Sequence, residues 1–282
     1  MIRKNLTKII TMCFMAAFIL GMANITAHAE TVRETEPNDT METAELILAN
    51  YETPAQAVTG NRPGQYVVKG DTSQTDEDWF KVQLSAGTQY ITCNGDDFNF
   101  EIYDPNKTLL VYGSFIKGSG VSASPFNAPM AGTYYLKITG NRITSTEYII
   151  SIGGPTYYYA GCEVRLNTVT MANSRDGSSA FDLRAEDVLP DGAVVDSIVV
   201  DIGGSRNAKS VTARNLTSNN TISLMNYTWS KSGLVNLNMP LKGNWTVTYG
   251  YNKNVSFNPS ITFQYVYPLT STTVPNKIVI SQ

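Results

Sequence analysis

The stretch Trp79-Phe80-Lys81-Val82-Gln83-Leu84 decides the fold class, because apolar and polar side chains alternate along it. Phe80, Val82 and Leu84 share one face of an extended chain, which predicts a strand with one buried and one exposed side. The same alternation recurs in later stretches, at Phe98/Phe100/Ile102, Tyr134/Leu136/Ile138 and Tyr148/Ile150/Ile152. Turn residues such as Asp104-Pro105-Asn106 separate these runs. The pattern predicts a series of short strands joined by tight turns.

The second half of the chain repeats this style without repeating the sequence. Its strand-like runs lie at residues 194–202, 221–229, 234–239, 244–251 and 261–267. Gly153-Gly154-Pro155 interrupts the pattern between the halves, and residues 41–48 give the one hint of a helix. Regularly spaced short strands predict an all-β protein with two tandem antiparallel β-sandwich domains, jelly-roll-like in character. We expect a signal peptide at 1–29, a first sandwich at 30–154 and a second at 155–282.

The composition fits a folded protein and gives no sign of nucleic-acid binding. Of the 282 residues, 42% are hydrophobic and 16% are charged, which is enough apolar material for a packed core. Lys and Arg number 21 against 24 Asp and Glu, so there is no basic excess to attract nucleic acid.

The first residues have the layout of a secretory signal peptide. Arg3, Lys4 and Lys8 precede an apolar run at 9–25, and Ala27-His28-Ala29 supplies the small residues of a cleavage site. The mature chain would carry 21 − 3 = 18 basic and 24 acidic groups, a net charge of −6, and no histidine. We therefore expect a secreted, extracellular bacterial protein without a membrane anchor and without imidazole catalysis.

Two cysteines, Cys93 and Cys162, remain in the mature chain. Export permits a disulfide between them, and a bridge would tie the two halves together. Two separate buried thiols are an equally open alternative.

Two acidic segments are the most informative polar features of the sequence. Glu34-Thr35-Glu36-Pro37-Asn38-Asp39-Thr40 concentrates oxygen ligands, and the residue before a proline is kept extended, so Glu34 and Glu36 point the same way. Asp76-Glu77-Asp78 places further carboxylates directly before the first aromatic strand. Calcium takes six to eight oxygen ligands in irregular geometry, which suits such a pair of segments. Capping of a short helix by Asp39 with Glu42, and solvated turn residues at Asp76 and Asp78, are the alternatives.

These segments, with others in the same order, resemble the bacterial pre-peptidase C-terminal domain, which is related to the collagen-binding domains of clostridial collagenases. The resemblance covers residues 33–153 and rests on the following motifs: 34–40 with Ala44 and Leu46, Asp76-Glu77-Asp78-Trp79-Phe80, Leu84-Ser85-Ala86-Gly87, Phe100-Glu101-Ile102-Tyr103-Asp104-Pro105, 131–138 and 148–152.

The resemblance implies a jelly-roll-like sandwich and a structural calcium ion. Carried over residue by residue, it implies that the ligands are Glu34, Glu36, Asn38, Asp39, Asp76 and Asp78. Related domains bind collagen through exposed aromatic side chains on one sheet face. The alternation at 134–138 turns Tyr135 outward, and Tyr103 and Tyr112 could join it in a ligand-binding face.

The second half offers no recognisable catalytic motif, so we name no catalytic residue. Residues 194–201 and Gly243-Asn244-Trp245 faintly resemble the P-domains of secreted proteases, too thinly to carry a residue across. Glu163, Asp182, Glu186 and Asp187 could furnish a carboxylate pair, but their spacing does not favour one.

The sequence therefore predicts a secreted, calcium-stabilised binding or adhesion protein, more readily non-enzymatic than enzymatic. Its partner would be an extracellular protein or a glycan. An exported hydrolase that uses carboxylates, or an accessory unit of one, is the alternative.

Overall fold

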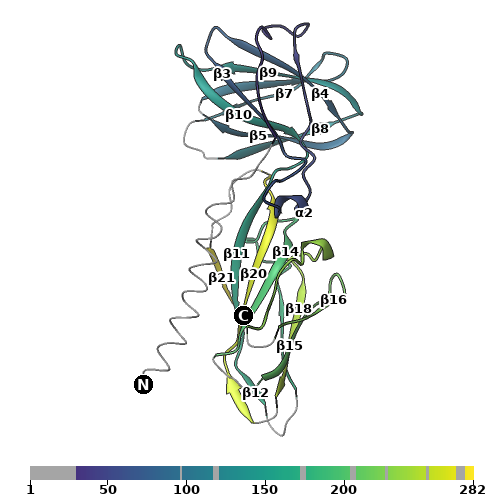
Figure 1. Ribbon diagram of the computed structural model, residues 1–282, viewed down its shortest axis with the longest axis vertical. Helices are drawn as coiled ribbons and strands as arrows, with labels where there is room; N and C mark the ends of the chain where they lie inside the picture. Colours follow the sequence, from purple (N-terminus) through teal and green to yellow (C-terminus); the bar gives the residue numbers. More distant parts are fainter. Residues whose placement is uncertain are drawn as a thin grey trace.

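The computed structural model describes residues 30–95, 97–116, 121–171, 176–203, 208–225, 228–251, 254–270 and 277–282. The expected signal peptide, residues 1–29, lies outside the described residues. The described chain is built almost entirely of strands, which form two sandwiches stacked end to end (Figure 1).

The first sandwich packs two five-stranded sheets against each other, with strand orders β1-β3-β10-β5-β8 and β2-β4-β9-β6-β7. Its strands are β1 (Glu30–Arg33), β2 (Glu45–Ile47), β3 (Tyr66–Thr72), β4 (Glu77–Leu84), β5 (Gly87–Gly95), β6 (Phe98–Tyr103), β7 (Leu109–Phe115), β8 (Ser122–Ala128), β9 (Gly132–Gly140) and β10 (Thr146–Gly153). The inward side chains Phe80, Val82 and Leu136 are fully buried, as the alternation in their strands predicts. One continuous apolar core therefore fills the space between the two sheets.

The second sandwich opposes a five-stranded sheet, β17-β14-β20-β11-β21, to a four-stranded sheet, β13-β18-β15-β16, with the short pair β12-β19 beside them. Its elements are β11 (Tyr157–Arg165), β12 (Val169–Met171), β13 (Gly177–Asp182), β14 (Val194–Asp201), β15 (Ala208–Asn215), β16 (Asn220–Ser223), β17 (Ser230–Lys231), the 3-10 turn η2 (Val235–Leu237), β18 (Asn244–Tyr251), β19 (Val255–Phe257), β20 (Ser260–Pro268) and β21 (Lys277–Ser281). Trp245 packs on Phe263 with ring centroids 4.8 Å apart, and both side chains are buried.

The prediction of an all-β, two-sandwich fold is confirmed, with one refinement in strand direction. Most strands pair antiparallel, but β1 with β3, β2 with β4 and β21 with β11 run parallel. Each of these parallel strands lies at the edge of its sheet. An edge strand needs only one partner, so a chain arriving from elsewhere in the fold can join there in either direction.

The prediction of a helix at 41–48 is wrong, because a turn and the strand β2 occupy these residues. Thr40 and Thr43 close a hydrogen-bonded turn, and β2 follows it with Ile47 turned inward opposite Val82. A helix forms instead one segment later, as α2 (Pro54–Ala57), where Thr53 and Gln56 make a reciprocal capping box. Pairing with β4 outweighs the weak local preference of residues 41–48, so Asp39 and Glu42 have no helix to cap.

Cys93 and Cys162 are both buried, each belongs to the core of a different sandwich, and no disulfide joins them. Of the two alternatives left open by the sequence, the structure therefore has the separate thiols.

The inner face of the first sandwich can be tested with a matched leucine pair. Leu136→Ala should lower the free energy of unfolding by about 2–5 kcal/mol, because Leu136 is fully buried and its truncation leaves a cavity. Leu109→Ala should change it by less than about 0.5 kcal/mol, because Leu109 is 46% exposed on the edge strand β7. Urea unfolding at 25 °C measures both values, and equal losses would contradict the assigned sheet faces.

Candidate metal centre

The segment between β1 and β2 is held across the first sandwich by its backbone. The Glu34 N–H donates to the Lys69 carbonyl at 2.9 Å, which continues the pairing of β1 with β3. Farther on, the Trp79 N–H donates to the Asn38 carbonyl at 2.9 Å, which ties the segment to β4 in the other sheet. The segment therefore bridges both sheets and brings its acidic side chains to the start of β4.

The two acidic segments converge on overlapping clusters of carboxylates. One oxygen each from Glu34, Glu36 and Asp78 lie within 4.8 Å of one another, and so do oxygens from Glu36, Asp39 and Asp76. Glu36 belongs to both groups, so the five carboxylates form one continuous site. We call these five residues together with Asn38 the acidic centre.

Tyr148 and Gly70 form the wall behind Glu34. The Tyr148 hydroxyl donates to Glu34 Oε2, and the Asp71 N–H donates to Glu34 Oε1 at 2.6 Å. Gly70 lies opposite Tyr148 across the β3–β10 pair, and a Cβ at this position would come within 2.2 Å of both Glu34 Oε2 and the Tyr148 ring. Only glycine leaves the space in which these two side chains meet.

Asp78 and Asn38 are the most unusual residues of the acidic centre. Both have no exposed surface. The two carboxylate oxygens of Asp78 and both polar side-chain atoms of Asn38 make no hydrogen bond of normal geometry. Buried polar atoms are nearly always paired in folded proteins, so four such atoms on two residues of the acidic centre need an explanation.

Burial and mutual repulsion shift the titration of these carboxyl groups. Burial first, and then the charges of Glu34 and Asp76, raise the pKa of Asp78 to about 8, while the Tyr148 hydroxyl opposes the shift. Burial also raises the pKa of Glu34 and of Asp76 above their ordinary values. In the absence of a cation, burial and mutual repulsion therefore disfavour the ionised forms of these groups, and Asp78 keeps its proton at neutral pH.

The chemistry of the donors fits a hard divalent cation. The acidic centre offers carboxylate oxygens and one amide oxygen, and no sulfur or imidazole, which is the ligand set that calcium prefers. An ion among them would pair with the unpaired oxygens of Asp78 and offset the repulsion among its neighbours.

The structure brings together the residues named from the sequence and adds two that were missed. Asp71, which the sequence left without a role, forms an ion pair with Arg33 and donates its backbone N–H to Glu34. Tyr148 and Gly70 were missed because their roles depend on the register between β3 and β10. From the sequence alone, Tyr148 is predicted only to point inward from its strand, and its contact with Glu34 cannot be inferred.

The three tyrosines named for ligand binding lie on the outward face of the sheet β2-β4-β9-β6-β7. Tyr135 of β9 is opposite Tyr103 of β6, and Tyr112 of β7 is opposite Glu101, two residues from Tyr103. Tyr112 is 79% exposed, whereas Tyr103 packs on Trp79 and donates its hydroxyl to Glu101. We call Tyr103, Tyr112 and Tyr135 the tyrosine face.

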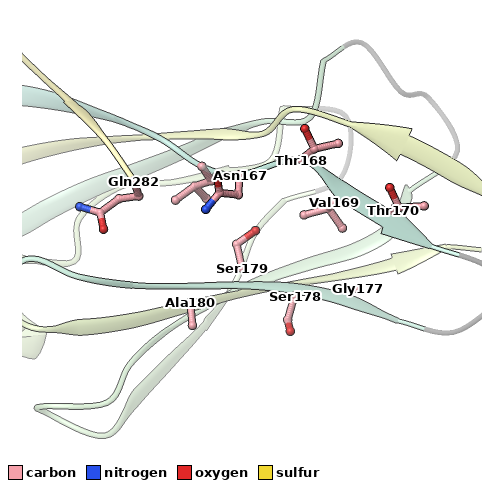
Figure 2. Close-up of a pocket in the computed structure, with 10 residues that line it drawn as sticks. Asn167, Thr168, Val169, Thr170, Gly177, Ser178, Ser179, Ala180 and Gln282 are labelled. Atoms are coloured by element: carbon pink, nitrogen blue, oxygen red, sulfur yellow. The ribbon is translucent and has the colours of Figure 1, made fainter.

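A cavity of about 370 Å³ opens at one edge of the second sandwich (Figure 2). Ser179 of β13 and Asn167 from the opposite layer point toward each other across it (Figure 2). Its lining side chains are amides, hydroxyls and small apolar groups, and none of them is ionisable. Among the described residues that line the cavity there is no carboxylate pair of the kind that a glycosidase needs.

Two of the acidic residues considered for catalysis in the second half are paired with neighbouring arginines. Asp182 forms an ion pair with Arg184, and Glu163 forms one with Arg165. Within the described residues, the groups of three possible metal ligands both belong to the acidic centre.

Comparison with known proteins identifies structural neighbours but no family. No family model matches the chain, and no curated protein sequence matches it. A protein of Eubacterium rectale that is thought to be secreted aligns over 91% of this chain and 90% of its own, with a TM-score of 0.50 and 11% identity. The pre-peptidase C-terminal domain of a Bacillus anthracis collagenase aligns over 42% of this chain and 99% of its own, at 18% identity and a TM-score of 0.29.

A third neighbour is a tandem of two CBM22 domains from Paenibacillus barcinonensis. It covers 70% of this chain and 85% of its own, at 9% identity and a TM-score of 0.21. Across the part of the chain that the structure describes, no helix has the length and apolar character needed to cross a membrane.

The raised pKa of Asp78 predicts how the free energy of unfolding of the metal-free protein depends on pH. Between the ordinary pKa of 3.8 and the folded value of about 8, the folded protein keeps a proton that the unfolded chain releases. Stability should therefore fall as the pH rises from about 4 to about 8, by about 1.4 kcal/mol for each unit of pKa difference. Asp78→Asn should remove this part of the pH dependence and be more stable than wild type at pH 8.5.

Urea unfolding at pH 5 and pH 8.5 measures the effect. Asp187→Asn is the control, because Asp187 is exposed and lies in the second sandwich. An Asp78→Asn profile that runs parallel to those of wild type and the control would contradict the buried, unpaired state of Asp78.

Proposed function

We propose that the protein is a secreted, calcium-stabilised binding protein that recognises an extracellular protein or polysaccharide. The observation that carries the metal part is Asp78, whose two buried carboxylate oxygens accept no hydrogen bond of normal geometry and lie beside four further carboxylates. A buried carboxylate without a hydrogen bond costs stability, and a coordinated cation is the partner that converts this cost into a gain.

The proposed ion would be structural. Glu34, Glu36, Asn38 and Asp39 come from the segment before β2, while Asp76 and Asp78 come from the start of β4. A cation shared between them would fasten the start of the mature chain to both sheets of the first sandwich. Because its ligands come from two separate segments, the ion's proposed contribution is to folding stability.

Secretion is supported by the layout of residues 1–29 and by the ordered motifs that resemble the pre-peptidase C-terminal domain. Calcium is also abundant outside cells, where extracellular modules bind it with millimolar to submillimolar affinity.

The proposed recognition surface is the tyrosine face. Tyr112 projects from an edge strand, and the exposed leucines Leu109 and Leu110 lie beside it on β7. Lys81 of β4 lies opposite Tyr135 and adds a positive charge on the side of the tyrosine face away from β7. Exposed tyrosines combine a large apolar ring with a polar hydroxyl, which suits contact with either a protein or a glycan.

Calcium should stabilise the wild-type protein against heat. At 100 times its dissociation constant, an ion that binds only the folded state adds about 2.7 kcal/mol, so the melting temperature should rise relative to protein in chelator. The double variant Glu36→Ala/Asp78→Ala should lose this difference, because it removes the shared ligand and the buried one.

Differential scanning calorimetry in CaCl2 and in EDTA provides the measurement, with Asp187→Ala as the control that keeps the calcium response. Identical wild-type melting curves in the two buffers would refute the structural ion.

The tyrosine face can be tested on an array of matrix proteins and glycans, read with calcium and with chelator. For any ligand that wild type binds, Tyr112→Ala and Tyr135→Ala should weaken binding at least about tenfold, as expected for anchor residues at an interface. Ile143→Ala is the control, because Ile143 is 87% exposed in the turn between β9 and β10, away from this face. Equal affinities for all three variants would reject the tyrosine face, and a wild-type protein that binds nothing on the array would contradict the binding role.

A further inference from the structure

Between β2 and β3 the chain leaves the first sandwich and returns to it. At the base of this excursion the Asn50 N–H donates to the Ile152 carbonyl at 2.8 Å, and the Tyr51 N–H donates to the Gly64 carbonyl at 3.0 Å. The side-chain amide of Asn50 also donates to the Gly154 carbonyl at 2.8 Å, directly before the second sandwich begins. We call residues 50–65 the junction loop; it contains α2, which lies between the two sandwiches (Figure 1).

A buried ion pair in the junction loop forms hydrogen bonds with the backbone of Tyr157, the first residue of the second sandwich. The side chain of Glu52 is fully buried, and Arg62 binds it through Nε at 2.5 Å and Nη2 at 2.6 Å. The same carboxylate accepts the Tyr157 N–H at 3.1 Å, and Arg62 Nη2 donates to the Tyr157 carbonyl at 2.7 Å. Both backbone groups at the start of β11 are therefore held by side chains from the first half of the chain.

Apolar contacts surround this ion pair. Three small side chains of the junction loop pack against a patch on the second sandwich. The loop residues are Ala55, Ala57 and Val58, and the patch consists of Tyr159, Val194, Val235 and Val266. The chain passes from β10 to β11 within Gly154, Pro155 and Thr156, and Thr156 is itself buried.

These contacts differ from those of a flexible linker. Linkers that permit domain motion are exposed and polar, and few contacts cross them. A buried bidentate ion pair is stable only while both partners and their additional hydrogen bonds stay in place, because an unpaired buried charge is strongly unfavourable. Rotation of one sandwich against the other would pull Tyr157 from Glu52 and Arg62 and expose the apolar patch.

We propose that the junction loop is a latch that locks the two sandwiches into one rigid body. The chain then presents the faces of both sandwiches to a partner in a fixed relative orientation. Breaking the latch turns the junction into a hinge while each sandwich keeps its own core.

Distances between spin labels in the full-length mature chain test the latch. Labels at Gln83→Cys on β4 and Thr221→Cys on β16 report on one sandwich each, and both positions are exposed. Cys93 and Cys162 are buried and stay out of reach of the label. The wild-type latch should give one narrow distance distribution, and Arg62→Gln should broaden it.

Arg142→Gln is the matched control, because it removes an arginine–carboxylate ion pair of 2.6 Å, with Asp97, inside the first sandwich. This variant should keep the narrow wild-type distribution. Ala57→Glu provides a second route, since it places a charge in the apolar contact without touching either core. If Arg62→Gln loses the far-ultraviolet circular dichroism signal of its strands, Ala57→Glu becomes the variant that tests the latch.

A broad distribution in wild type would overturn the latch. A narrow distribution in a folded Arg62→Gln or, where that variant does not fold, in Ala57→Glu would overturn it as well. Neither result depends on calcium or on the tyrosine face, so both leave the proposed function standing.

Discussion

The arrangement of the first sandwich depends on a carboxylate held away from water. Asp78 lies at the start of β4 with no exposed surface, and its neighbours within reach of the same point are other acids. Two sheets, the segment before β2 and Tyr148 all meet around it. Burying such a group without a partner is costly, and this cost is the physical basis of the proposed cation.

The sequence predicts the sheet faces well, because alternation is a local property. Phe80, Leu136 and Ile150 are buried on the faces that their neighbours in sequence predict. The acidic segments could also be named, since carboxylates close together in sequence before a strand already indicate an oxygen-rich site. These features need no knowledge of which strand pairs with which.

Features that depend on which strands pair, and in which register, could not be predicted from the sequence. Gly70 and Tyr148 face each other only because β3 and β10 pair in one particular register. The expected helix at 41–48 was wrong for the same reason, since pairing of β2 with β4 overrides local preference. The ion pair of Glu52 and Arg62 also joins residues whose partner, Tyr157, lies far away along the chain.

The most direct test of the account is a high-resolution structure from crystals grown in calcium chloride. If the proposed ion is bound, density for it should lie among Glu34, Glu36 and Asp78, with metal–oxygen distances of about 2.3–2.6 Å and a contact from an Asp78 oxygen. The account would be contradicted by a fully ordered acidic centre that holds no ion at saturating calcium, with Asp78 protonated and hydrogen-bonded to one of its neighbours.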